Sequence, residues 1–247
     1  MKCFDAHDHL QNYASSEEEA AAVAAARAAG VEGMLCCGTS PDDWGRVLEI
    51  AERYEDVVPA FGLHPWFTAE DGWLGRLGEF LRRVPRACVG EIGLDAVRET
   101  VGQEENFRAQ LELAARLGRS SVIHCVGKWG RLSELLGRAG LPSFMLHAYG
   151  GPAEMVKAFA ALGGYFSFNG EILTPGRERL RAALAAVPPE RLLLETESPE
   201  PDAPGWRSGP AGVAEVAAAA AAVLGRPTEE LAALTLVNAR RFTGEAR

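Results

Sequence analysis

Short apolar runs alternate with longer amphipathic stretches along almost the whole chain. The runs are rich in Val, Ile, Leu and Phe and have the length of buried strands. In the longer stretches, apolar residues recur at the spacing of a helix that packs one face against a core. The pattern predicts eight strands, at residues 2–7, 33–38, 57–63, 87–92, 121–125, 143–147, 164–168 and 192–195.

Nine helices are predicted between and after these strands, and several have recognisable ends. Ser15 and Ser16, followed by three glutamates, are typical of a helix start, whereas Gly30, Gly118 and Gly140 are typical of helix ends. The predicted helices cover residues 16–29, 42–53, 73–83, 103–117, 128–139, 152–162, 176–186, 212–224 and 228–242.

Strands that alternate with helices form a parallel sheet with right-handed crossover connections. Eight such units in 247 residues fit a (β/α)8 barrel. A doubly wound open sheet is the alternative, but it favours a glycine-rich turn after the first strand, and AHDHL at 6–10 is not one. We therefore predict a single-domain α/β protein, a TIM-type (β/α)8 barrel spanning residues 1–247.

Composition and charge narrow the class of protein. The chain is 47% hydrophobic and 24% charged, which is typical of a globular protein. Its net charge of −9 argues against a protein that coats duplex nucleic acid, but not against one that binds anions through a metal. The five cysteines lie in or beside apolar runs, as expected of buried thiols in a reducing compartment. Residues 1–10 lack the regions of a signal peptide, and the apolar stretch 213–224 is too short to span a membrane, so we expect a cytoplasmic protein.

All five histidines fall at or just after the carboxyl end of a predicted strand. Because a β/α barrel places its active site at that face, these side chains are expected to converge. Two of them form a His-x-His pair, in which the two-residue period of a strand points both rings to one side and the intervening Asp8 to the other. The five are His7, His9, His64, His124 and His147.

Carboxylates join the histidines from two further strand ends. Glu91 and Glu197 end apolar runs, where a buried acid is costly unless a metal or hydrogen bonds compensate it. This inventory exceeds what one closed zinc site needs, and two adjacent divalent ions explain it better. An iron site of two histidines and one carboxylate leaves several residues unexplained. No Gly-x-Ser-x-Gly turn occurs, and Cys125 points away from its neighbour His124, so a nucleophilic serine or cysteine is poorly supported.

Blocks of sequence in order along nearly the whole chain resemble the TatD family of metal-dependent hydrolases, within the amidohydrolase-like barrels. Smaller matches lie on the predicted helix 103–117 and at NARRF, 238–242. The principal blocks are FDAHDHL at 4–10, FGLHP at 61–65, VGEIGLD at 89–95, VIHC at 122–125, LHAYGG at 146–151 and LLLETESP at 192–199.

The resemblance implies phosphodiester hydrolysis, typically deoxyribonuclease activity, with one or two divalent ions such as Zn, Mg or Mn. It implies that His7, His9, Glu91 and the acid after the eighth strand bind the first ion. Glu91 then bridges to a second ion held by His124 and His147. In the resulting mechanism, Glu197 or Glu91 orients a metal-activated water that attacks the phosphate.

One position departs from the family pattern. The family motif ends in Glu-Thr-Asp, whereas this chain has Glu195, Thr196 and Glu197. A glutamate is longer by one C–C bond, roughly 1.5 Å, while catalytic groups are usually held to within about 0.5 Å. Either the strand end or the metal has adjusted, or the site is weakened. Glu195 is expected one layer deeper, where it supports the site.

The predicted substrate is nucleic acid as single strands or ends, with no stable duplex binding, no membrane contact and a monomer by default. His64, Lys128 and Arg177 are the candidate contacts for its phosphates. The alternative for His64 is a structural role, in which it packs against its own loop or supports a ligand. The alternative for Lys128 and Arg177 is that they are solvated charges at helix starts. Tryptophans near the catalytic side could stack bases or pack loops, and 198–210 could be a lid or a long loop. The tryptophans are Trp44, Trp66, Trp73, Trp129 and Trp206.

Other functions fit the same barrel. Hydrolysis of an amide or ester is one, although the carboxylated lysine that bridges the metals in many such enzymes has no counterpart near Glu91. Removal of a D-amino acid from tRNA is another. A metal-binding scaffold without catalysis is the third, and its support in the sequence is Glu197.

Overall fold

The strands form one parallel sheet that curves into a barrel. In the computed structural model, which describes residues 1–199 and 209–244, the strand order is β1 through β8 and every neighbouring pair is parallel. Beyond the end of β8, Glu197 N–H donates to His7 O at 3.0 Å and His9 N–H donates to Ser198 O at 2.7 Å. These bonds tie the last strand to the first, and the predicted TIM-type barrel is confirmed.

All eight predicted strands are present, with small differences in their ends. β4 extends three residues past its predicted end, to Asp95, whereas β6 and β8 are short. The strands are β1 (Cys3–Asp8), β2 (Val31–Cys37), β3 (Val57–Phe61), β4 (Cys88–Asp95), β5 (Ser121–Val126), β6 (Phe144–Leu146), β7 (Gly164–Phe168) and β8 (Leu192–Leu194).

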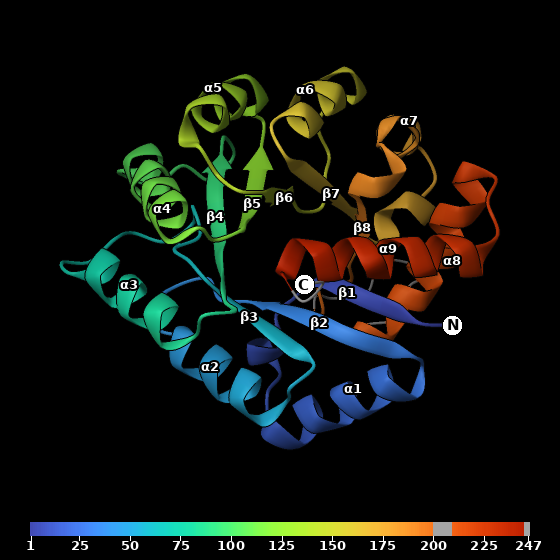
Figure 1. Cartoon of the computed structure of the whole chain (residues 1–247), viewed down its shortest axis with the longest axis horizontal. Helices are drawn as coiled ribbons and strands as arrows, with labels where there is room; N and C mark the ends of the chain where they lie inside the picture. Colours follow the sequence, from blue (N-terminus) through green and yellow to red (C-terminus); the bar gives the residue numbers. More distant parts are fainter. Residues whose placement is uncertain (200–208, 245–247) are drawn as a thin grey trace.

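The helices of the described residues surround the barrel (Figure 1). One prediction was wrong: the helix expected over 152–162 is a 3-10 turn, Ala153–Met155, followed by a short α6. The helices are α1 (Ser16–Ala28), α2 (Trp44–Arg53), α3 (Trp73–Arg83), α4 (Gln103–Leu117), α5 (Trp129–Ala139), α6 (Val156–Ala161), α7 (Glu178–Ala186), α8 (Val213–Leu224) and α9 (Thr228–Thr243).

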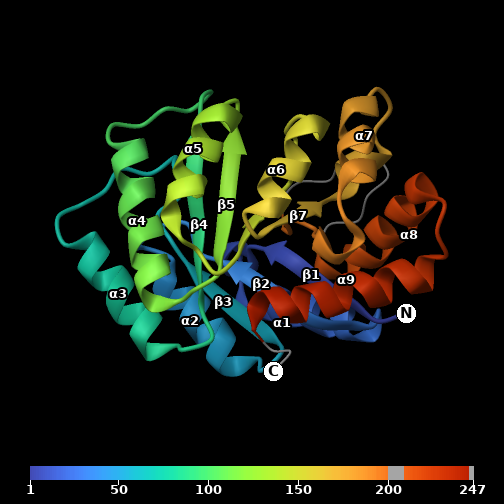
Figure 2. The ribbon, with the colours of Figure 1, turned by 45° about the horizontal axis from the view of Figure 1, so that its top comes forward.

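Apolar side chains fill two regions, one between the strands and the surrounding helices and one inside the barrel. Helix α9 closes the inner region at the amino ends of the strands, where Leu236, Ala239 and Phe242 join the interior cluster (Figure 2). There, Asn238 Nδ2 donates to the carbonyl of Leu192, the first residue of β8, at 2.9 Å. With this end closed, the carboxyl ends of the strands are left for the site.

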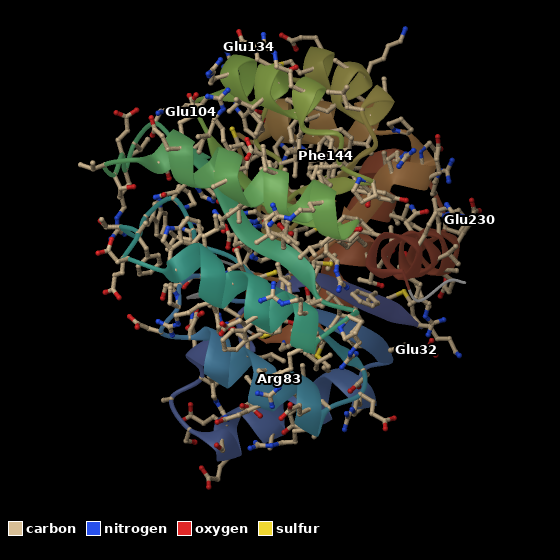
Figure 3. The ribbon with its side chains drawn as sticks, turned by 60° about the vertical axis from the view of Figure 1, so that its left-hand side comes forward. Glu32, Arg83, Glu104, Glu134, Phe144 and Glu230 are labelled. Carbon is tan, nitrogen blue, oxygen red and sulfur yellow. The ribbon has the colours of Figure 1, made fainter. Side chains whose placement is uncertain are left out.

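Charged side chains lie mainly on the outer faces of the helices. Figure 3 shows Glu104 on α4 and Glu134 on α5 at the surface, while Phe144 lies inside. Arg131 forms ion pairs with both glutamates across this surface, at 2.5 Å with Glu104 and 2.6 Å with Glu134. The five cysteines are buried, as the sequence predicted. In the described ranges no helix is long and apolar enough to cross a membrane.

Candidate active site

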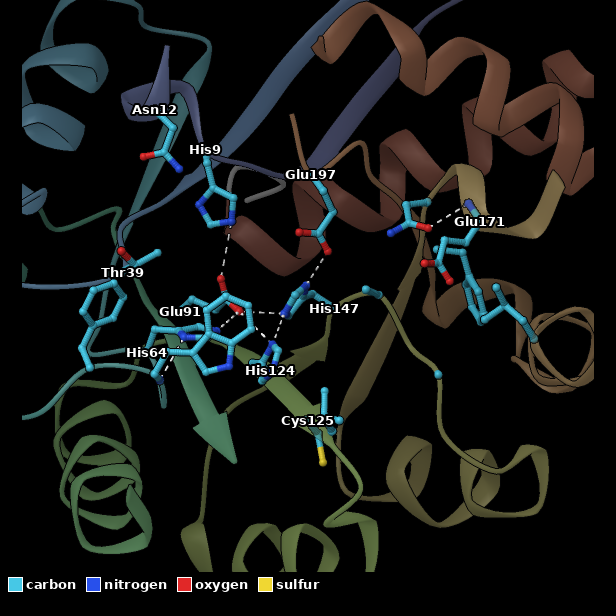
Figure 4. A pocket seen from close by; sticks show the side chains of 18 residues that line it. His9, Asn12, Thr39, His64, Glu91, His124, Cys125, His147, Glu171 and Glu197 are labelled. Carbon is cyan, nitrogen blue, oxygen red and sulfur yellow. Dashed lines mark hydrogen bonds and ion pairs between the residues drawn. The ribbon is translucent and has the colours of Figure 1, made fainter. Parts of the chain in front are cut away.

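The residues predicted to bind metal converge at the carboxyl ends of the strands. They line or underlie a cavity of about 610 Å³ (Figure 4). His7 comes from β1 and is fully buried, and His9 follows the strand. Glu91 lies in β4, His124 in β5, His147 directly after β6 and Glu197 three residues after β8. The structure therefore brings together six residues that are up to 190 positions apart in the chain.

Glu91 lies between two groups of histidines, with one carboxylate oxygen facing each. Its Oε2 is 3.4 Å from His7 Nε2 and 3.6 Å from His9 Nε2. Its Oε1 is 3.0 Å from His64 Nε2, 3.3 Å from His124 Nδ1 and 2.8 Å from His147 Nε2. When the two oxygens of one carboxylate face different groups of ligands, the carboxylate can be shared by two adjacent cations.

Hydrogen bonds outside the cluster determine which ring nitrogens are free to bind a cation. His9 Nδ1 donates to the carbonyl of Cys37 at 2.8 Å, and this leaves the lone pair of Nε2 facing Glu91 and His7. His124 Nε2 donates to Asp95 Oδ2 at 3.1 Å, which leaves Nδ1 free. A ligating histidine normally has its second nitrogen fixed by such a partner.

His64 has the opposite arrangement. Its Nδ1 accepts the backbone N–H of Trp66 at 3.2 Å, so Nε2 bears the hydrogen and donates it to Glu91 Oε1. A nitrogen that bears a hydrogen cannot bind a metal. His64 is therefore a donor that faces Glu91, and its geometry suits a hydrogen bond to an oxygen anion.

The electrostatics of the cluster favour a cation. Burial raises the pKa of Glu91, but His147, His64 and His124 outweigh this effect and hold it well below its usual value. Burial likewise raises the pKa of Glu197, and His147 and His7 bring it down to about 2. Burial and the charge of His147 lower the pKa of His7 to about 4. Two ionised carboxylates therefore share the cluster with a neutral His7.

His147 shows where positive charge is needed. Burial lowers the pKa of this ring, but Glu91 and Glu197 on either side outweigh burial and raise it well above its usual value. Its Nδ1 is 3.0 Å from Glu197 Oε1, and its Nε2 is 2.8 Å from Glu91 Oε1. A proton on His147 thus compensates the two carboxylates, a role that a divalent cation in the cluster would take over.

The donor set fits divalent cations. Candidate ligand atoms lie within 4.8 Å of one another in two groups, His7 with His9 and Glu91, and His7 with His147 and Glu197. A third such group joins Glu91 and His124 with His64, whose Nε2 acts as a donor and not as a ligand. His7 Nε2 faces Glu91 and His9, whereas its buried Nδ1 has no hydrogen-bond partner in the described part of the chain. Neutral imidazoles and carboxylates are ligands for Zn, Mn and similar ions. The residues present therefore fit one or two divalent ions.

Glu197 reaches the cluster despite its extra length. Its backbone is left-handed, with φ of 62°, and its N–H is bonded to His7 O. The two oxygens of its side chain lie 3.0 Å from His147 Nδ1 and 4.0 Å from His7 Nε2. The glutamate therefore reaches the predicted ligands, and the alternatives stated from the sequence stay predictions.

Asp95 was not predicted as a site residue, but it supports His124. Its Oδ2 accepts hydrogen bonds from His124 Nε2 at 3.1 Å and Trp66 Nε1 at 2.7 Å. Its Oδ1 accepts the backbone N–H groups of Val97 and Arg98 at 2.7 and 2.9 Å. Burial raises its pKa, but these donors outweigh burial and lower it. The block VGEIGLD at 89–95 could have indicated this role. Asp95 ends the strand four residues after Glu91, and its side chain therefore belongs to the same face of the barrel.

Two deeper carboxyl groups hold the segment that bears Glu197. Glu195 accepts hydrogen bonds from Ala148 N–H at 2.6 Å and from Ser167 Oγ, and Asp5 accepts the N–H of Thr196 at 2.9 Å. Burial raises the pKa of Glu195, and that of Asp5, to about 8. These raised pKa values favour the uncharged forms of both groups, which add no further negative charge beside Glu91 and Glu197. Glu195 lies deeper than Glu197, as predicted.

The predicted basic contacts do not face the cavity. Lys128 Nζ pairs with Glu99 at 2.5 Å, and Arg177 pairs with Glu171 at 3.3 Å. Neither side chain is among the described residues that line the cavity. Their ion pairs agree with the alternative interpretation of charges at helix starts.

The tryptophans differ from one another in their surroundings. Trp44 is fully buried, and its Nε1 donates to the carbonyl of Gly62 at 2.9 Å. Trp73 packs in the core, and Trp129 packs against Tyr149 with ring centroids 5.1 Å apart. Trp66 alone of these four lines the cavity. Trp206 and most of the 198–210 segment lie outside the described residues, so the lid remains a prediction.

An eight-stranded β/α barrel with a histidine and carboxylate cluster at the carboxyl ends of its strands defines a metal-dependent hydrolase. The family model described as TatD related DNase matches residues 4–244, and the chain belongs to this family.

Relatives of known name are similar over nearly their full length. The 3'-5' ssDNA/RNA exonuclease TatD of Erwinia tasmaniensis is 31% identical, over 97% of this chain and 98% of the relative. The uncharacterized metal-dependent hydrolase YjjV of Escherichia coli K12 is 30% identical, over 95% of each. The crystal structure of this YjjV, a TatD homologue, matches with a TM-score of 0.89 and 29% identity, over 97% of each chain.

Proposed function

We propose that this protein is a metal-dependent phosphodiesterase that removes nucleotides from single-stranded nucleic acid or from strand ends. The observation on which the proposal depends is the division of Glu91 between the pair His7 and His9 and the pair His124 and His147. The names of the relatives, 3'-5' ssDNA/RNA exonuclease, support the substrate class.

Two groups of residues are proposed to hold the cations. His7, His9 and Glu91 Oε2 would hold the first, with Glu197 beside it. His124 Nδ1, His147 Nε2 and Glu91 Oε1 would hold the second. When bound, such cations polarise a phosphoryl oxygen and increase the acidity of water.

Glu197 is the proposed proton acceptor. Its carboxylate is ionised, and its side chain is 17% exposed at the cavity, whereas that of Glu91 is 3% exposed. An attacking water in the cavity would therefore give its proton to Glu197. His147 Nδ1, at 3.0 Å, keeps the carboxylate aimed at that position.

His64 is proposed to stabilise negative charge on the substrate. Its Nε2–H lies at the cavity wall and donates to Glu91 in the absence of substrate. A phosphoryl oxygen placed between the two histidine groups would accept this hydrogen bond as its charge increases. The proposed roles thus divide into cation binding, proton transfer at Glu197 and charge stabilisation at His64.

The test combines metal analysis of the purified protein with degradation of a labelled single-stranded DNA in Mg²⁺, Mn²⁺ or Zn²⁺. A chelator and the His124→Ala variant, purified in parallel, exclude a contaminating nuclease. Near-stoichiometric metal with chelator-sensitive cleavage that the variant lacks is the expected result. Bound metal without cleavage of any strand would redirect the search to amide and ester substrates. Absence of metal after reconstitution would refute the proposal.

A further inference from the structure

Exposed apolar side chains border the cavity on the side of β3 and β4. Trp66 and Phe67 are 40% and 41% exposed and both line the cavity that contains Glu91. On the next loop, Val97 and Val101 are 85% and 87% exposed. Large exposed aromatic side chains that line the same cavity as a candidate active site, as Trp66 and Phe67 do, are typical of a binding surface.

The Trp66 side chain is held in place although much of it is exposed. Its Nε1 donates to Asp95 Oδ2 at 2.7 Å, and its backbone N–H donates to His64 Nδ1 at 3.2 Å. Its ring meets the His64 ring edge to face, with centroids 4.7 Å apart. Little side-chain entropy is therefore left to lose when a ligand contacts the indole.

Arg98 lies on Trp66. Its guanidinium carbon is 4.7 Å from the centroid of the indole, and its backbone N–H donates to Asp95 at 2.9 Å. Lys128 and Arg177 are paired with Glu99 and Glu171, whereas in the part of the chain that the structure describes no carboxylate forms an ion pair with Arg98. A guanidinium stacked on a ring keeps the N–H groups at its edge for a phosphate.

We propose that Trp66, Phe67 and Arg98 form a nucleotide subsite. Trp66 and Phe67 bind the unpaired base beside the scissile phosphate, and Arg98 binds a neighbouring backbone phosphate. Aromatic rings stack on any unpaired base, whereas a base within a duplex has no free face. The subsite therefore selects single strands and frayed ends with little preference for sequence. This inference rests on the proposed function.

The test of base stacking compares two single-stranded oligonucleotides that differ in one residue. One has a normal base at the nucleotide to be released, and the other is abasic there. We expect wild-type kcat/KM to favour the base by about 5- to 150-fold, the range given by alanine substitution at stacking sites. In Trp66→Ala this ratio falls towards one. The ratio is taken within each variant, so a general loss of activity cancels.

A second variant separates stacking from the hydrogen bond to Asp95. Trp66→Phe keeps an aromatic ring but removes the indole N–H. We expect it to retain most of the base preference that Trp66→Ala loses, even if its overall activity falls. An unchanged base preference in Trp66→Ala, with wild-type cleavage intact, would overturn the subsite but leave the proposed function standing. Absence of wild-type cleavage of both strands would overturn both.

The role of Arg98 is tested by salt dependence. A phosphate contact to a single strand contributes about −0.7 to the slope of log affinity against log salt. We expect Arg98→Ala to reduce the magnitude of the slope of log kcat/KM by about that amount, while the matched control Arg177→Ala leaves it unchanged. Equal slopes in wild type and Arg98→Ala would remove Arg98 from the subsite.

Discussion

Replacement of Asp95 by asparagine changes a single atom type at a point where every neighbouring group is a hydrogen-bond donor. Oδ2 accepts from His124 Nε2 and Trp66 Nε1, and Oδ1 accepts from Val97 N–H and Arg98 N–H. In either orientation, the amide of asparagine presents its NH2 group to two donors. Asp95→Asn therefore loses two hydrogen bonds without a large change in shape.

The size of the effect follows from which bonds are lost. If the NH2 group faces Val97 and Arg98, on an exposed loop, water can replace the lost partners. His124 keeps a hydrogen-bond acceptor in this orientation, but it loses the negatively charged partner that makes its ring a stronger metal ligand. Loss of such an outer partner typically costs 10- to 100-fold in metal affinity or activity, or about 1.4–2.7 kcal/mol. We expect a decrease of this size in affinity for the cation held by His124 and in kcat/KM.

The assay is calorimetric titration of metal-free wild type and variants with Zn²⁺ or Mn²⁺, alongside oligonucleotide cleavage. Glu99→Gln is the matched control, because Glu99 lies on the same loop but pairs with Lys128. Asp95→Asn should weaken one metal-binding step while Glu99→Gln resembles wild type. If Asp95→Asn binds both cations within threefold of wild type and cleaves at the same rate, Asp95 does not position His124.

Three further predictions test other parts of the structure. Glu197→Asp should lower kcat/KM by about tenfold or more, because a side chain shorter by roughly 1.5 Å withdraws from His147 and His7; an increase in turnover would show instead that the glutamate impairs the site. Trp44→Phe should lower the free energy of unfolding by about 1–3 kcal/mol in chemical denaturation, since it leaves the buried carbonyl of Gly62 without its donor; a stability equal to wild type would contradict this. Removal of divalent ions by a chelator should lower the Tm, and addition of a cation at 100 times its Kd should raise the free energy of unfolding by about 2.7 kcal/mol. Calorimetry that shows the same Tm with and without chelator would argue against a cation between Glu91 and Glu197.

The fold, and the convergence of the residues that we propose to bind cations, could be predicted from sequence because both depend on local pattern. Buried parallel strands produce apolar runs, and helices between them produce a helical period, so the order of elements implies the barrel. The barrel in turn brings every strand end to one face. His7, Glu91 and His147 could therefore be placed together before any of their distances was known.

The boundaries of the elements were less predictable. The structure continues β4 through Asp95, where Gln103 Oε1 accepts the backbone N–H of Asp95 at 2.9 Å. This contact comes from the next helix and is invisible to a pattern of apolar residues. The same applies to the turn at Ala153–Met155, which replaced the first part of a predicted helix.

Only the tertiary structure shows the partners from which a role is proposed for each side chain. Whether a histidine is a metal ligand or a donor depends on the partner of its second nitrogen, which is Cys37 for His9, Asp95 for His124 and the Trp66 backbone for His64. These partners lie on other strands and loops. Likewise, Trp44 and Trp66 each lie near a strand end in sequence, yet the first is buried and the second lines the cavity. The sequence by itself determines which chemical groups reach the face of the barrel, because strand period and chain order are local. Hydrogen-bond partners and exposure are properties of packing between distant segments, and they determine what each group does there.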